Sequence, residues 1–269
     1  MAGFNEKGQW DGHYEQNAEH IDWLCSYETL RKLVRDHLWN WPPPIPAILL
    51  LGTGLSTFAE DLYDSGFRLI TVIDFAEEPA RVHLQRTERP PRHGIKVFQR
   101  DVSDPEWPDV DELGLQYGMV VDKGLIDCLL TSPKGMAAAS AAITNVWSRM
   151  TTPGVWLSVS HSPPRDRRDL YCLTAAAAEG SSSVYWHQLK VRRVRLPPLE
   201  YAAAFTAPGE ETVEELAEEG DEGAAGGSPG EAGPGGGRGG GGASAGDGGD
   251  GLGVSGFADD VAYIYEMTK

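Results

Sequence analysis

The sequence predicts an α/β fold with a mostly parallel sheet, helices on both of its faces and an antiparallel strand at the C-terminus. Short apolar runs alternate with amphipathic stretches along most of the chain. Strands that are separated by single helices run parallel, because the crossover places each helix on a face of the sheet. The last segment, Val261–Met267, is rich in β-branched and aromatic residues and is typical of a strand. This strand must pair with one upstream.

The first three elements show the pattern. A helix is expected over Asp22–Trp41, which three consecutive prolines end. Ala47–Leu51 is a continuous apolar run, typical of a strand that is buried on both faces. A helix over 56–65 follows, and Gly66 is placed to end it. One face of the first helix is expected to be apolar, with Trp23, Tyr27, Leu30, Val34 and Leu38 at helical spacing.

The later elements continue the alternation up to residue 194. We expect strand Arg68–Asp74, helix Glu77–Arg89, strand Ile95–Arg100, strand Tyr117–Val121, an alanine-rich helix over Pro133–Met150, strand Val155–Ser160, helix Arg167–Glu179 and strand Val184–Val194. With the C-terminal strand, these elements predict one sheet of seven strands.

Composition changes sharply near Gly209. Residues 209–256 hold 20 of the 33 glycines, 11 acidic residues and one arginine. Such a segment cannot bury enough apolar surface to offset its ordering entropy, so we expect it to be disordered. Within it, Glu211–Glu219 could form a short acidic helix, and the segment could serve as a solvated spacer or as an acidic docking element. The predicted domain is therefore 1–208 plus 257–269, with a disordered Gly-rich acidic insertion over 209–256.

Composition also restricts the class of protein. The chain has 269 residues and a formal net charge of −17, and an acidic surface argues against nucleic-acid binding. Its three cysteines, Cys25, Cys128 and Cys172, fit neither a disulfide framework nor a CxxC metal site. No leader peptide is recognisable, and no window reaches the roughly 20 apolar residues that a membrane span needs. We therefore expect a soluble, cytoplasmic protein.

Two positions at strand ends predict a ligand site. The first strand runs into Gly52-Thr53-Gly54-Leu55-Ser56, where missing Cβ atoms let a ligand approach the backbone. The next strand ends in Asp74, about 20 residues on, where an acid can hydrogen-bond both hydroxyls of a ribose. Together they indicate an adenosyl ligand, which at this point is either a nicotinamide cofactor or S-adenosylmethionine.

Three features favour S-adenosylmethionine. The loop is GTGLS and lacks the third glycine that dinucleotide-binding enzymes use for close helix–strand packing. Asp101, after the third strand, could accept a hydrogen bond from an adenine amino group. The sheet also ends in a hairpin-like strand and not in another βα unit.

Several motifs resemble a known family. The matching pieces are Trp10-Asp11 with Tyr14, Ile48–Ser56, Leu62–Phe67, Ile70–Phe75, Arg100-Asp101-Val102, Val121–Leu130 and Tyr263-Ile264-Tyr265. On these residues the chain resembles the methyltransferase-like proteins related to the lysine and N-terminal methyltransferases of translation elongation factor 1-alpha. The resemblance extends over about residues 5–200 and 257–269. It implies a Rossmann-like, seven-stranded class I methyltransferase sheet.

The resemblance also implies a set of site residues. S-adenosylmethionine would be bound by Trp10, Tyr14, Gly52, Gly54, Ser56, Asp74, Phe75, Asp101 and Val102, with Asp122 and Lys123 at the mouth of the fourth strand. The family usually has GCGNS where this chain has GTGLS, so Thr53 and Leu55 depart from its pattern. Trp10 and Tyr14 could form a lid over the cofactor or simply cover the sheet edge.

A lysine substrate sets the chemical requirement. Its amine, with a reference pKa of about 10.4, has to lose a proton before it can attack. We expect Asp122 to orient the amine and Lys123 to shape the cofactor pocket; the alternative is a structural turn with an ion pair. Asp127 is interpreted as an acid at a helix start, and His161 as a structural residue. Six arginines could form a basic patch or be ordinary solvated charges: Arg165, Arg167, Arg168, Arg192, Arg193 and Arg195.

The predicted function is an S-adenosylmethionine-dependent methyltransferase that acts on a protein amine. The resemblance favours a lysine of a translation factor, and neither nucleic acid nor a membrane is an expected partner. Two other functions remain open. One is a small-molecule methyltransferase or an aminopropyl transferase, and the other is a non-catalytic scaffold of the same fold.

Overall fold

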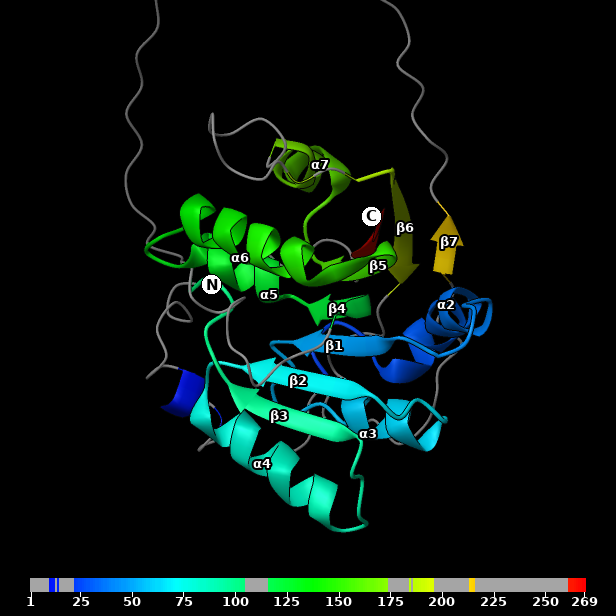
Figure 1. Ribbon diagram of the computed structural model, residues 1–269. Helices are drawn as coiled ribbons and strands as arrows, with labels where there is room; N and C mark the ends of the chain where they lie inside the picture. The colour runs from blue at the N-terminus through cyan, green and yellow to red at the C-terminus, as the bar shows by residue number, and fades with distance from the viewer. Residues whose placement is uncertain are drawn as a thin grey trace, which may run out of the picture. The chain divides into compact units, whose positions relative to one another are not determined.

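The computed structural model describes residues 10–12, 14, 22–104, 116–173, 184, 186–195, 213–215 and 261–269. These residues form one twisted sheet with helices on both faces (Figure 1). The strand order is β3-β2-β1-β4-β5-β8-β6-β7. This order confirms the predicted Rossmann-like class I methyltransferase sheet of seven strands, to which the short edge strand β7 is added.

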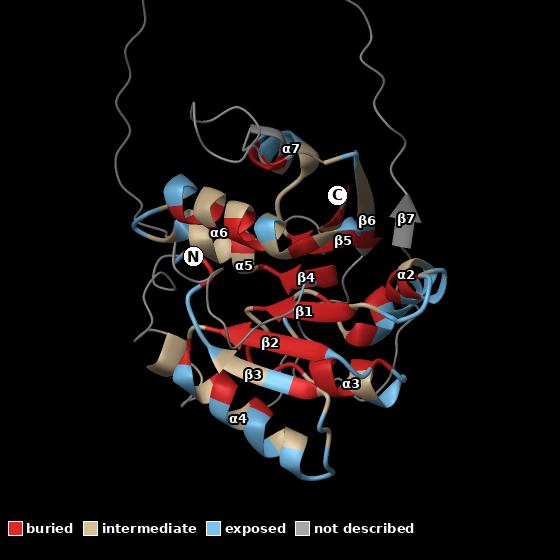
Figure 2. Cartoon of the chain, in the orientation of Figure 1, coloured by how far each residue is buried: buried red, intermediate tan, exposed pale blue. Residues whose placement is uncertain are grey.

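The first five strands in sequence form the parallel half of the sheet. They are β1 (Ala47–Leu51), β2 (Ile70–Asp74), β3 (Ile95–Gln99), β4 (Tyr117–Lys123) and β5 (Met150–Ser160). Every residue of β1, β2 and β4 is buried (Figure 2), as expected of parallel strands covered on both faces. The strand order reverses between β1 and β4, because β2 and β3 are added on one side of β1 and β4 and β5 on the other. The connections that leave the carboxyl ends of these two parallel strands therefore pass to opposite faces of the sheet and leave a crevice for a ligand.

The C-terminal strand β8 (Val261–Thr268) lies between β5 and β6 (Gln188–Arg195) and runs antiparallel to both. The prediction that this strand pairs upstream is therefore confirmed. At the edge, β7 (Val213–Glu215) pairs antiparallel with β6, where the sequence had allowed a short helix. The rest of the predicted insertion, 209–212 and 216–256, lies outside the described residues, and its disorder stays a prediction.

Side chains alternate between the two faces of the sheet. On β1, Ile48 and Leu50 pack with α2 (Tyr27–Trp39) and α3 (Phe58–Asp64). Leu49 and Leu51 pack on the other face, with side chains of three further helices. Those helices are α5 (Leu125–Thr131), α6 (Met136–Arg149) and α7 (Pro164–Leu173). The remaining helix, α4 (Glu77–Glu88), contacts β2 and β3.

Some boundaries differ from the expectation. The first helix begins at Tyr27 and not at Asp22, because Leu24 has a φ of 70°, which a right-handed helix cannot contain. Trp23 therefore does not lie on the apolar face of that helix. Gly135, with a φ of 48°, separates α5 from α6, so the alanine-rich helix starts later than expected. The end of the predicted helix Arg167–Glu179 lies outside the described residues, and the strand expected from Val184 begins at Gln188.

In the described part of the chain, the structure contains no helix long and apolar enough to cross a membrane.

Candidate functional site

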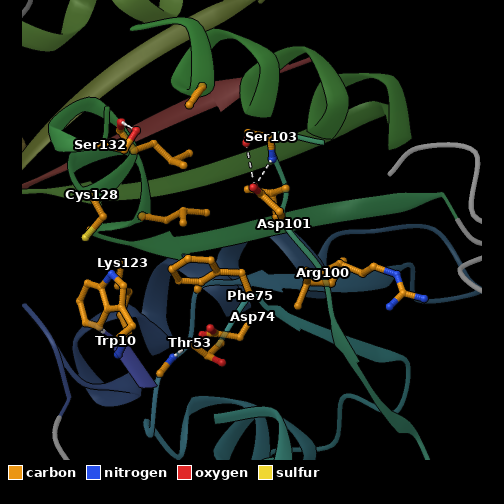
Figure 3. A pocket seen from close by; sticks show the side chains of 18 of the residues that line it. Trp10, Thr53, Asp74, Phe75, Arg100, Asp101, Ser103, Lys123, Cys128 and Ser132 are labelled. Carbon is orange, nitrogen blue, oxygen red and sulfur yellow. Dashed lines mark hydrogen bonds between the residues drawn. The ribbon is translucent and has the colours of Figure 1, made fainter. Parts of the chain in front are cut away.

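A cavity of about 680 Å³ opens where the carboxyl ends of the parallel strands meet the N-terminal residues Trp10 and Tyr14 (Figure 3). This is the edge of an open α/β sheet at which ligands usually bind, and the volume suits a molecule of cofactor size. The cavity contacts eight of the nine residues expected to bind the cofactor: Trp10, Tyr14, Gly52, Gly54, Asp74, Phe75, Asp101 and Val102.

The loop after β1 requires glycine at two positions. Gly52 and Gly54 have φ angles of 56° and 53°, in the left-handed region that other L-residues rarely adopt. A Cβ atom on Gly54 would lie 2.8 Å from Oη of Tyr14, and one on Gly52 would lie 3.1 Å from Cδ1 of Leu125. The backbone conformation therefore favours glycine at both positions, and an added Cβ atom would also make Tyr14 or Leu125 shift. The resulting loop forms the floor of the cavity.

Asp74 ends β2 beside this loop. Its side chain is buried, with 4% exposure. Oδ2 accepts a hydrogen bond from the Gly54 N–H at 3.0 Å, and Oδ1 accepts one from the Ala76 N–H at 3.0 Å. Burial raises the pKa of the Asp74 carboxyl, while these backbone donors act in the opposite direction. The Phe75 amide also acts on this carboxylate. An ionised carboxylate has about four acceptor positions, so acceptor capacity remains for a ligand hydroxyl.

Asp101 follows β3 on another wall of the cavity. Its Oδ1 accepts hydrogen bonds from the Ser103 N–H and Oγ, both at 2.8 Å (Figure 3). Oδ2 has no hydrogen-bond partner among the residues that the structure describes. Asn145 of α6 holds this loop by donating from Nδ2 to the carbonyl of Val102 at 3.0 Å. Asp101 can therefore offer an oxygen to a ligand donor.

Trp10 and Tyr14 lie in the wall of the cavity. Their rings stack with centroids 5.5 Å apart. Between them in sequence, Asp11 accepts a hydrogen bond at 3.0 Å from the Glu77 N–H at the start of α4. This contact anchors the N-terminal residues beside the glycine loop. Burial, and secondarily the negative charge of Asp74, raises the pKa of the Tyr14 phenol.

Lys123, at the end of β4, lines the cavity, and its Nζ atom is fully engaged in hydrogen bonds. Nζ donates to Oδ1 of Asp22 at 2.6 Å, to the Cys25 carbonyl at 2.8 Å and to Oγ of Ser56 at 3.2 Å. Oγ of Ser56 also donates to Asp22. Ser56 is therefore buried below the loop and, unlike the other predicted cofactor residues, does not line the cavity. The ion pair of Lys123 and Asp22 holds the segment before α2 against the site.

Trp23 is a site residue that the sequence does not indicate, because its helical spacing from Tyr27 and Leu30 predicted a place on the apolar face of the first helix. Its side chain is 40% exposed and lines the cavity. A Cβ atom on Gly124 would lie 3.0 Å from Cδ1 of Trp23, so the indole rests directly on the backbone after Lys123. The ring of His161 meets the Trp23 indole edge-on, with centroids 6.5 Å apart.

Cys128 is a second lining residue that was not expected. Its place one turn into the helix after β4 could have indicated it.

Asp122 does not line the cavity. Successive residues of a strand point to opposite faces, so Asp122 faces away from the side on which Lys123 is engaged. Its side chain is 1% exposed, and Oδ2 accepts a hydrogen bond from Nε1 of Trp156 at 2.8 Å. Oδ1 has no hydrogen-bond partner among the described residues. Burial raises the pKa of this carboxyl to about 7. The expected contact between Asp122 and an incoming amine is not favoured by this position.

Asp127 lies in the first turn of α5, as interpreted from the sequence. It accepts hydrogen bonds from Oγ of Ser160 at 2.6 Å, from the His161 N–H at 3.0 Å and from Nη2 of Arg167 at 2.8 Å. Arg192 similarly pairs with the buried Glu266 at 3.1 Å. Two arginines of the suggested basic patch are therefore engaged in ion pairs within the fold.

The described residues contain no group of three histidine, cysteine or acidic side chains that could hold a metal ion.

Comparison with known proteins finds relatives of modest similarity. No family model matches the chain. The eEF1A lysine and N-terminal methyltransferase homolog of Drosophila pseudoobscura pseudoobscura is 27% identical over 160 residues, which cover 58% of this chain and 22% of that protein. The human eEF1A lysine and N-terminal methyltransferase is 25% identical over 162 residues, with the same two coverages. The resemblance to these methyltransferases is confirmed.

The extent of the match differs among the relatives. The chain spans about a fifth of the length of the first two. EEF1A lysine methyltransferase 4 of Bos taurus is 24% identical over 183 residues, which cover 63% of this chain and 66% of that protein. Among solved structures, the N-methyltransferase NodS of Bradyrhizobium japonicum is 20% identical, with coverages of 52% and 64% and a TM-score of 0.40. A likeness that distant carries no information about the site.

Proposed function

We propose that the chain is an S-adenosylmethionine-dependent methyltransferase that modifies an amine of another protein. The observation that carries the proposal is the arrangement of Asp74. Its carboxylate is fixed by the Gly54 and Ala76 amides and retains acceptor positions at the wall of a cofactor-sized cavity. This is the position from which an acid binds ribose hydroxyls in sheets of this kind.

The residues present fit S-adenosylmethionine. Asp74 would accept hydrogen bonds from the ribose hydroxyls, and Asp101 would accept one from the adenine amino group. Gly52 and Gly54 leave the floor of the cavity free of side chains. Phe75 and Val102 supply apolar surface for a base, while Trp10 and Tyr14 would limit the access of water from the N-terminal side.

The cofactor would supply a methyl group on a positively charged sulfur, which an amine lone pair can attack without a metal or a covalent intermediate. The protein then has to align the amine and keep water out. Where β4 ends, the cavity has apolar and aromatic walls, including Trp23, Leu125 and Leu129. The charge of Lys123 at this end is balanced by Asp22.

These walls suggest how an acceptor lysine loses its proton. Desolvation disfavours the charged form of an amine and lowers its pKa, so an apolar channel promotes release of the proton to water. We propose that Asp122 supports the site from behind, through Trp156, and does not touch the amine. Lys123 would shape the site by holding Trp23 in place.

The substrate proposal rests on the relatives. Their names specify eEF1A and lysine or N-terminal methylation. We therefore propose a lysine of a translation elongation factor as the acceptor, which makes that factor the protein partner.

The test is transfer of a labelled methyl group from S-adenosylmethionine to purified translation elongation factor 1-alpha. Wild type should label the factor at a lysine, located by mass spectrometry. Asp74→Ala should abolish labelling, because it removes the proposed ribose acceptor. Asp36→Ala, which changes an exposed acid on α2 that pairs only with its neighbour Lys32 among the described residues, should label like wild type. Cofactor binding without labelled lysine would overturn the proposed substrate, whereas absence of cofactor binding would overturn the proposed activity.

A further inference from the structure

A buried cluster of ionisable side chains lies beneath the glycine loop, outside the cavity. At its centre is His83 of α4, whose side chain is 0% exposed. Nε2 of His83 lies 3.0 Å from the Gly54 carbonyl and 3.0 Å from Oγ1 of Thr53. On the other side of the ring, Nδ1 lies 3.2 Å from Oε1 of Glu60 in α3.

These contacts determine the protonation state of the imidazole. The Gly54 carbonyl can only accept a hydrogen bond, so Nε2 must carry a proton. Burial alone would raise the pKa of Glu60, but the hydrogen bond and the charge of His83 outweigh it and lower that pKa. An ionised Glu60 also only accepts, so Nδ1 must carry a proton as well. With both ring nitrogens donating, His83 and Glu60 form a buried ion pair in which each charge has its partner.

A second cation on the same helix holds the following residues of the loop. Nη1 of Arg86 donates to the Leu55 carbonyl at 2.8 Å and to the Ser56 carbonyl at 3.3 Å. Together, His83 and Arg86 bind three consecutive carbonyl groups of the loop. From the opposite side, Asp74 accepts from the Gly54 amide, so the loop is fixed through both its carbonyls and its amide.

We propose that the Glu60–His83 ion pair and Arg86 are positioning residues that hold the glycine loop in the conformation that receives the cofactor. This inference rests on the proposed function for the identity of the ligand. The loop has positive φ angles at Gly52 and Gly54 and so does not belong to a helix or strand that would fix it. The hydrogen bonds from His83 and Arg86 to the loop carbonyls fix it instead. Such charge-assisted hydrogen bonds are about twice as strong as neutral ones.

The charged groups facing His83 come from three elements. They are Glu60 of α3, Asp74 of β2 and Arg86 of α4. Replacing the imidazole by an apolar side chain would leave the carboxylate of Glu60 buried without this partner.

The experiment combines two measurements on the full chain. The first is amide hydrogen exchange of Gly52, Gly54 and Ser56 in the ligand-free protein; their amides donate to Ile73, Asp74 and Thr53, respectively. The second is calorimetric affinity for S-adenosylhomocysteine. His83→Leu should speed exchange at Gly54 and Ser56 at least tenfold and weaken affinity about 10- to 100-fold, the range expected for a lost buried hydrogen bond to a charged group.

Further variants separate positioning from folding. His83→Gln keeps one donor toward the Gly54 carbonyl, so it should recover part of the affinity. Glu60→Gln and Arg86→Met should each speed exchange in the loop, and they provide the test if His83→Leu fails to fold. Arg81→Met is the matched control, because Arg81 lies on the same helix, is exposed and pairs only with Glu78 among the described residues; it should behave as wild type.

Two results have distinct meanings. Unchanged exchange at Gly54 and Ser56 in folded His83→Leu, Glu60→Gln and Arg86→Met would overturn the positioning role, whatever the ligand. Failure of wild type to bind S-adenosylhomocysteine would instead overturn the proposed function, while the exchange measurement would still decide whether the cluster holds the loop.

Discussion

Gly54→Ala should damage both stability and ligand binding, by an amount that can be worked from the structure. A left-handed conformation costs an L-residue about 1–2 kcal/mol, and Gly54 has a φ of 53°. The added Cβ atom would also lie 2.8 Å from Oη of Tyr14, a distance at which the phenol must move. We expect a total loss of about 2–3 kcal/mol, or roughly 4–12 °C in Tm for a domain of this size. S-adenosylhomocysteine should bind more weakly because Tyr14 lines the cavity.

A double-mutant cycle isolates the steric part of this effect. Tyr14→Phe removes Oη, after which the nearest atom to the new Cβ is Cζ at 3.4 Å, an ordinary contact. Tyr14→Phe/Gly54→Ala should therefore lose about 1 kcal/mol less than the sum of the single variants. Gly66→Ala provides the control, because Gly66 has a φ of 108° but a Cβ atom added there would meet nothing within 4 Å. It should lose stability without losing affinity. Additivity of the cycle within about 0.3 kcal/mol would refute the close packing of Tyr14 on the loop.

Three further predictions concern the end of β4 and the helix after it. The pKa of Asp122 is raised from 3.8 to about 7, so the folded protein binds more protons than the unfolded chain between these values. Wild type should gain stability relative to Asp122→Asn as the pH falls from 7 toward 4 in urea denaturation, and a constant difference would contradict this. Lys123→Met should lose about 3–5 kcal/mol, because it removes the cation that donates to Asp22, to the Cys25 carbonyl and to Ser56. Asp22→Asn/Lys123→Met should recover part of the loss, and no recovery would argue against the ion pair. Burial raises the pKa of the Cys128 thiol to about 12, so iodoacetamide should modify this thiol much more slowly than a free thiol at pH 8. Bound S-adenosylhomocysteine should slow the modification further. Rapid modification of Cys128, located by peptide mass spectrometry, would contradict its placement in the cavity.

The fold was predictable where local pattern and tertiary structure agree. The apolar run Ala47–Leu51 became a strand with the expected bounds. The alternation of the C-terminal residues required a pairing partner, and β8 has one on each side. The strand β7 was not predictable, because the acidic residues of 211–219 favour a helix locally and only pairing with β6 extends Val213–Glu215.

The site was predictable wherever a residue follows the end of a parallel strand. That rule places Gly52, Gly54, Asp74 and Asp101 at one cavity. It does not specify which face a strand residue occupies, and for this reason Asp122 was expected at the cavity although its side chain packs behind it on Trp156. Resolving the two faces of β4 requires the register with its neighbours, which a single sequence does not contain.

Contacts between distant segments were beyond prediction. Trp23 reaches the cavity for two reasons. The positive φ of Leu24 keeps Trp23 out of the helix, and the side chain of Lys123, 101 residues along the chain from Asp22, holds Asp22 beside the site. His83 and Glu60 look like ordinary polar positions of two amphipathic helices, and only the packing of α4 beside α3 brings them together under the loop.

The central claim, that the cavity binds S-adenosylmethionine through Asp74, is tested most directly by calorimetric titration with S-adenosylhomocysteine. Wild type and the Asp36→Ala control should bind with one site per chain, and Asp74→Ala should lose binding while remaining folded by circular dichroism. Equal binding by Asp74→Ala, or no binding by folded wild type, would contradict the claim.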